Sequence, residues 1–228
     1  MNLSPRLKKI VDLVPKNSIV ADIGTDHGYV PKHLVDEGIS KLVIATDISK
    51  GSLQKTIDYI REENLQEDIH TRLGDGLDPI LPFEVDTVII AGMGGILISE
   101  ILASSMFKAK SINTLILQPM VGSEELRRFL HASGFLILDE ELVKEGDKYY
   151  EIIVAKVGLQ KFENEIDYEI SPVLLEKNNP LTKELIESRL MVNEKIILKL
   201  RENPGEKSRE RLLELERTAK DYREVLGR

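Results

Sequence analysis

The sequence predicts an α/β fold: a doubly wound, mostly parallel seven-stranded sheet that ends in an antiparallel hairpin, followed by a C-terminal antiparallel helical hairpin of the coiled-coil kind. Three observations predict it. In the first two thirds of the 228-residue chain, short runs rich in Val and Ile alternate with helical patterns. Two strand-like segments then follow each other with only a turn between them. The last part of the chain carries helical patterns alone.

Five segments are predicted to form the parallel part of the sheet. In four of them the apolar run lacks polar alternation, which is typical of strands buried on both faces. Helical stretches separate most of them, so each strand should reach the next through a right-handed crossover. The segments are 18–22, 41–47, 69–73, 85–91 and 113–118, of which 69–73 has the weakest pattern.

The remaining elements of the first part follow from the same patterns. An amphipathic helix at 5–13 precedes the first strand, and a hairpin with strands at 135–143 and 149–157 closes the sheet. The hairpin turn contains Glu145-Gly146-Asp147, which is typical turn chemistry. The other helices are expected at 30–37, 49–64, 96–103 and 123–133.

Three regions of the chain are predicted from these elements. Residues 1–157 form the sheet domain, residues 158–179 form a connector, and residues 180–228 form two helices. Pro172 and Asn178-Asn179-Pro180 mark the connector and its end. Asn203-Pro204-Gly205 is expected to end the first of these helices and to let the second return beside it.

Composition excludes several classes of protein. The chain has no cysteine, which excludes disulfides, thiolate zinc sites and cysteine nucleophiles. The four histidines lack zinc-site spacing, so no metal is expected. The N-terminal segment has no long apolar stretch, and no run approaches the ~18 residues of a membrane span. We therefore expect a cytoplasmic protein without a membrane partner.

The charge of the chain is unevenly distributed. The net charge is −8, from 31 basic and 39 acidic residues, which argues against non-specific binding of nucleic acid. Residues 1–157 carry 17 basic and 24 acidic residues, whereas residues 158–228 carry 14 and 15. The C-terminal part is therefore nearly neutral but rich in charge, and a local basic face is possible there.

The loop after the first strand has the strongest ligand-binding signal. Its sequence, Asp22-Ile-Gly-Thr-Asp-His-Gly28, would place a ligand at the carboxyl edge of the sheet. Gly24 allows a close backbone approach and Gly28 allows the turn into the helix. Asp26 stands where a dinucleotide fingerprint needs its second glycine, and a carboxylate there disfavours a pyrophosphate. A cationic sulfonium ligand fits better, with Asp22 organising the loop or binding an ammonium group.

Two further acids follow the next two strands. Asp47 ends the second strand about 20 residues after the loop, where an acid typically accepts hydrogen bonds from ribose hydroxyls. Asp75, within Gly74-Asp75-Gly76, could accept a hydrogen bond from an adenine amino group. Each acid alone could be a cap or a turn residue, but three acids in register with three strands favour a nucleoside site.

Three motifs carry a closer resemblance. DIGTDHGYVP (22–31), AGMGG (91–95) and LQPM (117–120), with the C-terminal helical pair, closely resemble the bacterial tRNA adenine-N1 methyltransferases that act on adenosine 22. That family belongs to the class I S-adenosylmethionine-dependent methyltransferases, which have a Rossmann-like sheet. The resemblance covers essentially the whole chain. It implies S-adenosyl-L-methionine as cofactor and tRNA as substrate, with methyl transfer to N1 of an adenine.

The resemblance also implies positions for the site. Cofactor contacts are expected from the first loop, from the ends of the second and third strands, and from the glycine-rich loop after the fourth. The expected cofactor-binding residues are Asp22, Gly24, Gly28, Asp47, Ile48, Asp75, Gly76 and Gly94.

The chemistry asks for placement more than for proton removal. Adenine N1 already has an in-plane lone pair, so catalysis needs in-line alignment and a group that tolerates the positive charge of the product. Asp26 could stabilise that charge or take a proton from the exocyclic amine, although it could also simply cap the next helix. Tyr29 could stack on the extruded base or pack in the core. His27 could contact the loop carbonyls or a phosphate, or serve the fold alone.

The glycine-rich loop after the fourth strand is the expected acceptor site. Gly92 keeps the backbone low beside a flat base, and Met93 offers an adaptable apolar contact. The loop lacks the Asn/Asp-Pro-Pro-aromatic motif of amino-methylating enzymes, which fits a ring nitrogen. Gln118-Pro-Met120 could border the acceptor pocket or form a structural turn.

The C-terminal helices carry many cations, interspersed with acids. They form either a solvated surface with i,i+4 pairs or a clamp for a tRNA arm. The cations concerned are Lys183, Arg189, Lys195, Lys199, Arg201, Lys207, Arg209, Arg211, Arg217, Lys220 and Arg223.

Three other functions stay open from the residues. A small-molecule methyltransferase would have no need of the helical hairpin, and an RNA-binding adaptor with an inert fold would have no need of the cofactor acids. An NAD-dependent oxidoreductase ranks last because the fingerprint fails. A monomer or a weak homo-oligomer is expected.

Overall fold

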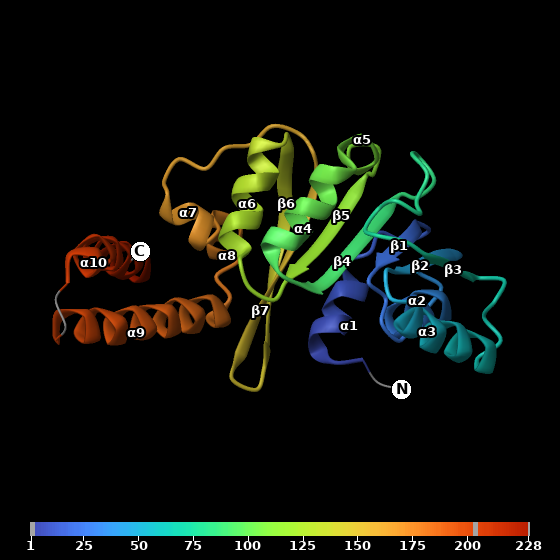
Figure 1. Ribbon diagram of the computed structural model, residues 1–228, viewed down its shortest axis with the longest axis horizontal. Coiled ribbons are helices and arrows are strands. Elements are labelled where there is room, and N and C mark those ends of the chain that lie inside the picture. Colours follow the sequence, from blue (N-terminus) through green and yellow to red (C-terminus); the bar gives the residue numbers. More distant parts are fainter. Residues whose placement is uncertain (1–2, 203–204, 228) are drawn as a thin grey trace. The chain divides into compact units, whose positions relative to one another are not determined.

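The computed structural model describes residues 3–202 and 205–227. The chain divides into two compact units, Met1–Lys161 and Phe162–Arg228. The first unit contains the whole sheet, and the second contains helices (Figure 1).

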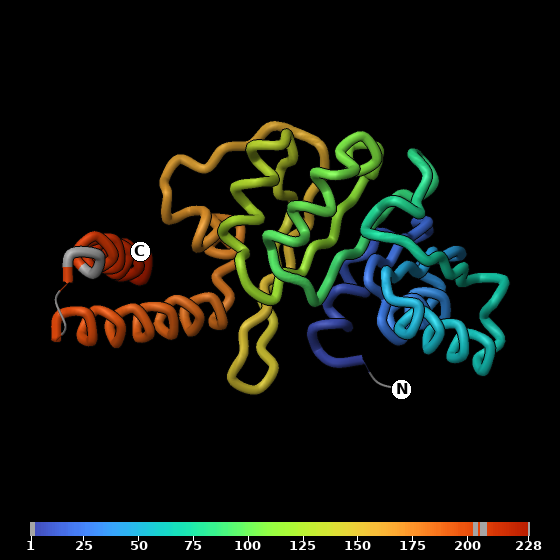
Figure 2. Tube along the Cα trace, viewed as in Figure 1, coloured from blue at the N-terminus to red at the C-terminus, as the bar shows by residue number. Residues whose placement is uncertain are grey.

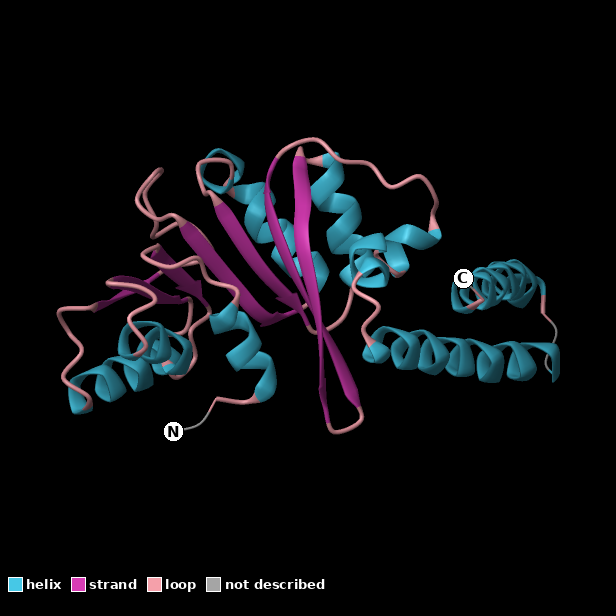
Figure 3. Ribbon diagram, turned by 180° about the vertical axis from the view of Figure 1, so that it is seen from behind, coloured by secondary structure: helices cyan, strands magenta, loops and turns pink. Residues whose placement is uncertain are grey.

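The first unit is built on a seven-stranded sheet in the order β3-β2-β1-β4-β5-β7-β6. The pairs among β1 to β5 are parallel, and β7 is antiparallel to both β5 and β6 (Figure 3). The predicted fold class is confirmed. The strands are β1 (Ile19–Ile23), β2 (Leu42–Asp47), β3 (Ile69–Leu73), β4 (Thr87–Met93), β5 (Thr114–Pro119), β6 (Phe135–Glu145) and β7 (Lys148–Val157).

Helices cover both faces of this sheet. Helices α1, α2 and α3 lie on one face, and α4 and α6 lie on the other (Figures 1 and 3). The short α5 was not predicted, because four residues carry too little periodicity to be distinguished from a turn. The helices of the first unit are α1 (Pro5–Asp12), α2 (Tyr29–Asp36), α3 (Lys50–Glu62), α4 (Gly95–Ser104), α5 (Met106–Ala109) and α6 (Ser123–Ala132).

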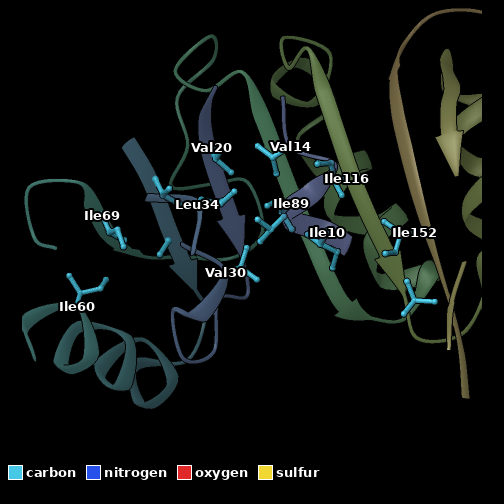
Figure 4. Packing of buried hydrophobic residues seen from close by; sticks show 14 residues of the cluster. Ile10, Val14, Val20, Val30, Leu34, Ile60, Ile69, Ile89, Ile116 and Ile152 are labelled. Carbon is cyan, nitrogen blue, oxygen red and sulfur yellow. The ribbon is translucent and has the colours of Figure 1, made fainter. Parts of the chain in front are cut away.

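A cluster of buried aliphatic side chains joins α1 to the sheet (Figure 4). Ile10 of α1 is fully buried beside Ile89, Ile116 and Ile152 from three neighbouring strands. Burying one such side chain contributes about 1.5–3 kcal/mol. This packing fixes α1 against the sheet, which matters because the first turn of α1 reaches the functional site.

An ion cluster ties the terminal hairpin to α6. Arg127 is fully buried, and its guanidinium donates to Glu140 at 2.9 Å and to Glu151 at 2.5 Å. Ser123 donates a further hydrogen bond to Glu151 at 2.8 Å. Burial disfavours the charged guanidinium, but the two carboxylates hold the pKa of Arg127 above its usual range. The charges compensate one another only while all three are present.

The second unit is a helical hairpin with two short helices (Figure 2). Apolar residues of α9 and α10 meet along the hairpin, with Ile197, Leu215 and Ala219 buried together. The helices are α7 (Ile166–Glu169), α8 (Pro172–Glu176), α9 (Pro180–Glu202) and α10 (Glu206–Leu226).

The predicted connector contributes to this second unit. Ile170, which lies within 158–179, is buried in one cluster with Ile186 of α9 and Tyr222 of α10. The Tyr222 hydroxyl also donates to the carboxylate of Glu169. Of the predicted helix stop, Asn203 and Pro204 lie outside the described residues. None of the described helices combines the length and the apolar character that crossing a bilayer requires.

Candidate active site

A cavity of about 850 Å³ lies at the carboxyl ends of β1, β2, β3 and β4. This is the edge at which open α/β sheets bind their ligands. All but two of the residues expected in the site line the cavity. The expected residues that line the cavity are Asp22, Gly24, Asp26, Tyr29, Asp47, Ile48, Asp75, Gly76, Gly92 and Met93.

The two exceptions, Gly28 and Gly94, are not cavity-lining residues. They are the N-cap residues of α2 and α4. Gly28 has a left-handed φ of 74°, and a Cβ there would lie 2.9 Å from Cγ2 of Thr56. Gly28 is therefore required by the backbone and by the packing of α3, a role that its place in the sequence motif does not distinguish from ligand contact.

The first loop is pinned to the neighbouring strand. The backbone N–H groups of Gly24 and Thr25 both donate to the carbonyl of Thr46, at 2.8 and 3.0 Å. Gly24 has a left-handed φ of 76°, and a Cβ on it would lie 2.4 Å from the terminal methyl carbon of Met93. The backbone of the first loop therefore borders the cavity and lies closer to the Met93 side chain than a residue with a Cβ would allow.

Asp22 is buried at the base of the cavity. Loss of hydration raises the pKa of its carboxyl group to about 6, and the nearby charge of Asp47 acts in the same direction. A buried carboxylate with a raised pKa is stabilised by an incoming cation. This is the electrostatic setting that an ammonium or sulfonium ligand needs.

The ends of β2 and β3 form the second wall. Asp47 is half-buried, and its Oδ1 accepts from the backbone N–H of Ser49 at 2.7 Å. The N–H of Gly74 donates to the backbone carbonyl of Asp47 at 3.1 Å, which holds the loop of Asp75 beside it. Oδ2 of Asp47 and the exposed carboxylate of Asp75 are thus left for a ligand.

Apolar and unpaired polar atoms complete that wall. The side chain of Ile48 is 68% exposed although it lines the cavity, so a flat ligand would cover it. The hydroxyl of Thr46 is buried and has no hydrogen-bond partner among the described residues. Together with the acids, these residues fit the adenosine part of a nucleoside cofactor.

Asp26 does not cap α2, which was the alternative role considered for it. Its side chain is 66% exposed, its Oδ2 lies 2.8 Å from Nδ1 of His27, and no side chain caps that helix. Asp26 has a left-handed φ of 49°. Asp tolerates this region better than most residues, which explains how it occupies a position where glycine is usual.

An aromatic stack extends from this pair. The ring of His27 lies parallel to that of Tyr29, with centroids 5.3 Å apart and an interplanar angle of 9°. Tyr29 meets the ring of Tyr59 edge-on at 5.5 Å. The close contact with Asp26 and the stack on Tyr29 together orient the His27 ring. The sequence alone did not predict that His27 and Asp26 form a pair.

Strand β4 extends into the glycine-rich loop that was expected to hold the methyl acceptor, and it ends at Met93 instead of at residue 91. Ala91 and Met93 pair with β5 across a bulge at Gly92, whose φ is 79°. The N–H of Met120 donates to the carbonyl of Met93 at 2.7 Å, and the N–H of Gly95 donates to the carbonyl of Val121 at 2.8 Å. Backbone hydrogen bonds therefore join the loop after β4 to the loop after β5.

Gln118 and Arg6 are additional residues at this end. Gln118 is fully buried, and its Oε1 accepts from the N–H of Gly92 at 3.2 Å, while its Nε2 donates to the carbonyl of Pro119 at 2.7 Å. Arg6 lines the cavity, and its Nη1 donates to the same Oε1. Sequence reasoning missed Arg6, because it lies in the helix before the first motif. No cluster in the described part of the chain suits a metal ion.

The comparisons with known proteins agree with this geometry. The family described as "Methyltransferase domain" matches residues 3–153, and the chain is therefore a methyltransferase-domain protein. The tRNA (adenine(22)-N(1))-methyltransferase of Bacillus subtilis is 35% identical to it over 158 residues, which are 69% of this chain and 66% of that enzyme.

Solved structures extend the match to the full length. The B. subtilis m1A22 tRNA methyltransferase TrmK is 28% identical, with a TM-score of 0.91, and 99% of each chain is covered. Streptococcus pneumoniae Sp1610 in complex with S-adenosyl-L-methionine is 31% identical, with a TM-score of 0.87, and 99% of this chain and 100% of that chain are covered. The chain belongs to the family of the bacterial tRNA (adenine(22)-N(1))-methyltransferases.

Proposed function

We propose that the protein transfers a methyl group from S-adenosyl-L-methionine to N1 of an adenine in tRNA, and that this adenine is nucleotide 22. The observation that carries the proposal is the cavity, where the ends of three successive strands bring Asp22, Asp47 and Asp75 together beside the Gly92–Met93 bulge. Family membership favours the same reaction and the same target.

The walls of the cavity suit this cofactor in chemistry and in order. Asp22 would hold its ammonium group, Asp47 its ribose hydroxyls and Asp75 its adenine amino group. Ile48 would cover the adenine face. When bound, the cofactor supplies a methyl group activated by a sulfonium. The residues of the chain then have to place the adenine N1 in line with it.

Asp26 and His27 are proposed to manage the positive charge of the product. The Asp26 carboxylate stabilises charge that develops on the ring, and His27, held by it at 2.8 Å, can receive the proton that leaves the exocyclic amine. Tyr29 presents an aromatic face beside this pair, on which an extruded base can stack. Gly92 and Met93 form the floor beneath the base.

The second unit is proposed to bind the tRNA. Several of its cations form ion pairs, as Arg201 does with Glu216 at 2.5 Å. Lys195, Lys199, Arg209 and Arg217 are exposed and have no ion-pair partner among the described residues, so they are available for phosphates.

The proposal can be tested with purified tRNA transcripts. The protein is incubated with labelled S-adenosylmethionine and an unmodified transcript with adenine at position 22, and the digested nucleosides are identified by mass spectrometry. We expect 1-methyladenosine from this transcript and none from the matched transcript with guanine at position 22.

The alternatives give different results in the same assay. A small-molecule methyltransferase would bind the cofactor and leave both transcripts unmodified. An inert RNA-binding adaptor would bind tRNA without transfer. Methylation of the exocyclic N6, or equal methylation of both transcripts, would contradict the proposed target.

Lys195→Gln/Lys199→Gln tests the role of the second unit. We expect weaker tRNA binding with unchanged cofactor affinity, whereas the control Arg201→Gln/Arg211→Gln, which removes two paired cations, should change binding less. Equal effects in the two variants would remove the unpaired cations from the proposed interface.

A further inference from the structure

The cavity is lined by four aspartates and by one arginine, Arg6. Asp22, Asp26, Asp47 and Asp75 line it, and among the described lining residues Arg6 alone is a lysine or an arginine. The acids have partners in the proposed function, namely the positive charge of the cofactor or the product, the ribose and the adenine. Arg6 has no partner in that account, which leaves two anions for it to bind: the carboxylate of the cofactor and a phosphate of the tRNA.

The guanidinium of Arg6 is held in place without being neutralised. Its Nη1 donates to Oε1 of Gln118 at 2.5 Å, and its central carbon lies 5.3 Å from the ring centre of Tyr150. The backbone N–H of Arg6 donates to the carboxylate of Glu145 at 2.7 Å, which fixes the residue at the start of α1. No described carboxylate forms an ion pair with its guanidinium.

Of the four other arginines of the first unit, three have carboxylate partners, and the fourth, Arg61, is exposed and does not line the cavity. Arg72, Arg127 and Arg128 each form an ion pair, at 2.6, 2.9 and 2.8 Å respectively. A guanidinium has five N–H donors in a planar fork, of which the hydrogen bond to Gln118 occupies one. Arg6 therefore presents an oriented and mostly unused fork to the cavity.

The position of Arg6 indicates which ligand it meets. Its contacts are with Gln118 of β5 and Tyr150 of β7, and its Nη1 lies 4.0 Å from the place of a Cβ on Gly92 in β4. The proposed adenosine acids follow β2 and β3, on the opposite side of β1 in the strand order. Arg6 is thus at the acceptor end of the cavity, away from the nucleoside part of the cofactor.

We propose that Arg6 binds a backbone phosphate of the tRNA next to the target adenine, an inference that rests on the proposed function. Guanidinium and phosphate match in geometry and can form two parallel hydrogen bonds. A phosphate contact carries no sequence information but fixes the register of the nucleotide. Gln118 is the positioning residue for this contact, because the same oxygen holds Arg6 and the N–H of Gly92.

The test compares Arg6→Gln with Arg6→Lys and with the control Lys8→Gln. Lys8 is exposed on the same helix, does not line the cavity, and its loss changes the net charge equally. tRNA affinity is measured at several salt concentrations, with cofactor affinity and thermal midpoint for each variant. For Arg6→Gln we expect tRNA affinity about tenfold lower and a log–log salt slope smaller by about 0.7–0.9.

Arg6→Lys should retain the salt slope but recover only part of the affinity, because a lysine keeps the charge and loses the fork. Lys8→Gln should resemble the wild type. A folded Arg6→Gln protein with unchanged tRNA affinity and slope would overturn the inference. So would a loss of cofactor affinity alone, which would assign Arg6 to the carboxylate of the cofactor. A wild-type protein that binds no tRNA would refute the proposed function itself, before any variant is compared.

Discussion

Replacing Asp22 by asparagine should make the free protein more stable and the cofactor complex weaker. The native pKa of Asp22 is about 6, against 3.8 for an unperturbed aspartate. A carboxyl group whose native pKa is raised destabilises the folded state as pH rises from about 4 to about 6, because the unfolded chain releases the proton more readily. The difference corresponds to about 3 kcal/mol at pH 7.

Asparagine keeps the shape of the side chain and has no charge to desolvate. We therefore expect Asp22→Asn to raise the free energy of unfolding at pH 7 by up to about 3 kcal/mol, and to differ little from the wild type near pH 4. The measurement is urea denaturation at a series of pH values.

The same substitution should act in the opposite direction on the cofactor. A cationic ligand needs the ionised carboxylate, so wild-type affinity should fall about tenfold for each pH unit below about 6, while the variant should show no such dependence. At pH 7 we expect the variant to bind about 10–100-fold more weakly, the scale of a lost hydrogen bond to a charged group. Equal stability at pH 7 together with unchanged affinity would refute this reasoning.

Three further changes test other parts of the structure. Asp47→Ala should weaken cofactor binding by about 1–3 kcal/mol, measured by calorimetry. Unchanged affinity in a folded variant would exclude Asp47 from the site. Asp26→Asn should leave cofactor affinity nearly unchanged and slow single-turnover methyl transfer by roughly 10²-fold or more. An unchanged rate would show that Asp26 has a structural role in its loop and none in methyl transfer. Arg127→Leu should lower the free energy of unfolding by about 3–5 kcal/mol, because it removes the guanidinium that compensates the buried carboxylates of Glu140 and Glu151; an unchanged free energy of unfolding would contradict this role of Arg127.

Most of the fold could be predicted because its signals are local. Buried Val and Ile runs mark four of the five parallel strands, and the Glu145-Gly146-Asp147 turn marks the terminal hairpin. The helix limits follow from apolar periodicity and agree with the structure to within about two residues. The short helix Met106–Ala109 was missed because one turn of helix has no periodicity to detect.

The candidate site could also be predicted only in part. Residues that follow a strand within a motif, such as Asp22 and Asp47, could be placed at the cavity from chain position alone, since parallel strands end at one edge. The pairing of Asp26 with His27 could not, because the left-handed backbone at Asp26 decides where its carboxylate points. A spacing rule gives strand ends but no side-chain direction.

Arg6 shows what such reasoning leaves out. It precedes the first motif by 16 positions and looks like an ordinary charged residue of an amphipathic helix. Only the packing of Ile10 against the sheet brings that helix to the acceptor end, where Gln118 holds the guanidinium. Every acid proposed for the cofactor lies at or just after the end of a strand, whereas Arg6 comes from a helix outside the motifs. The part of the site proposed to meet the substrate therefore depends on tertiary packing more than the part proposed to bind the cofactor.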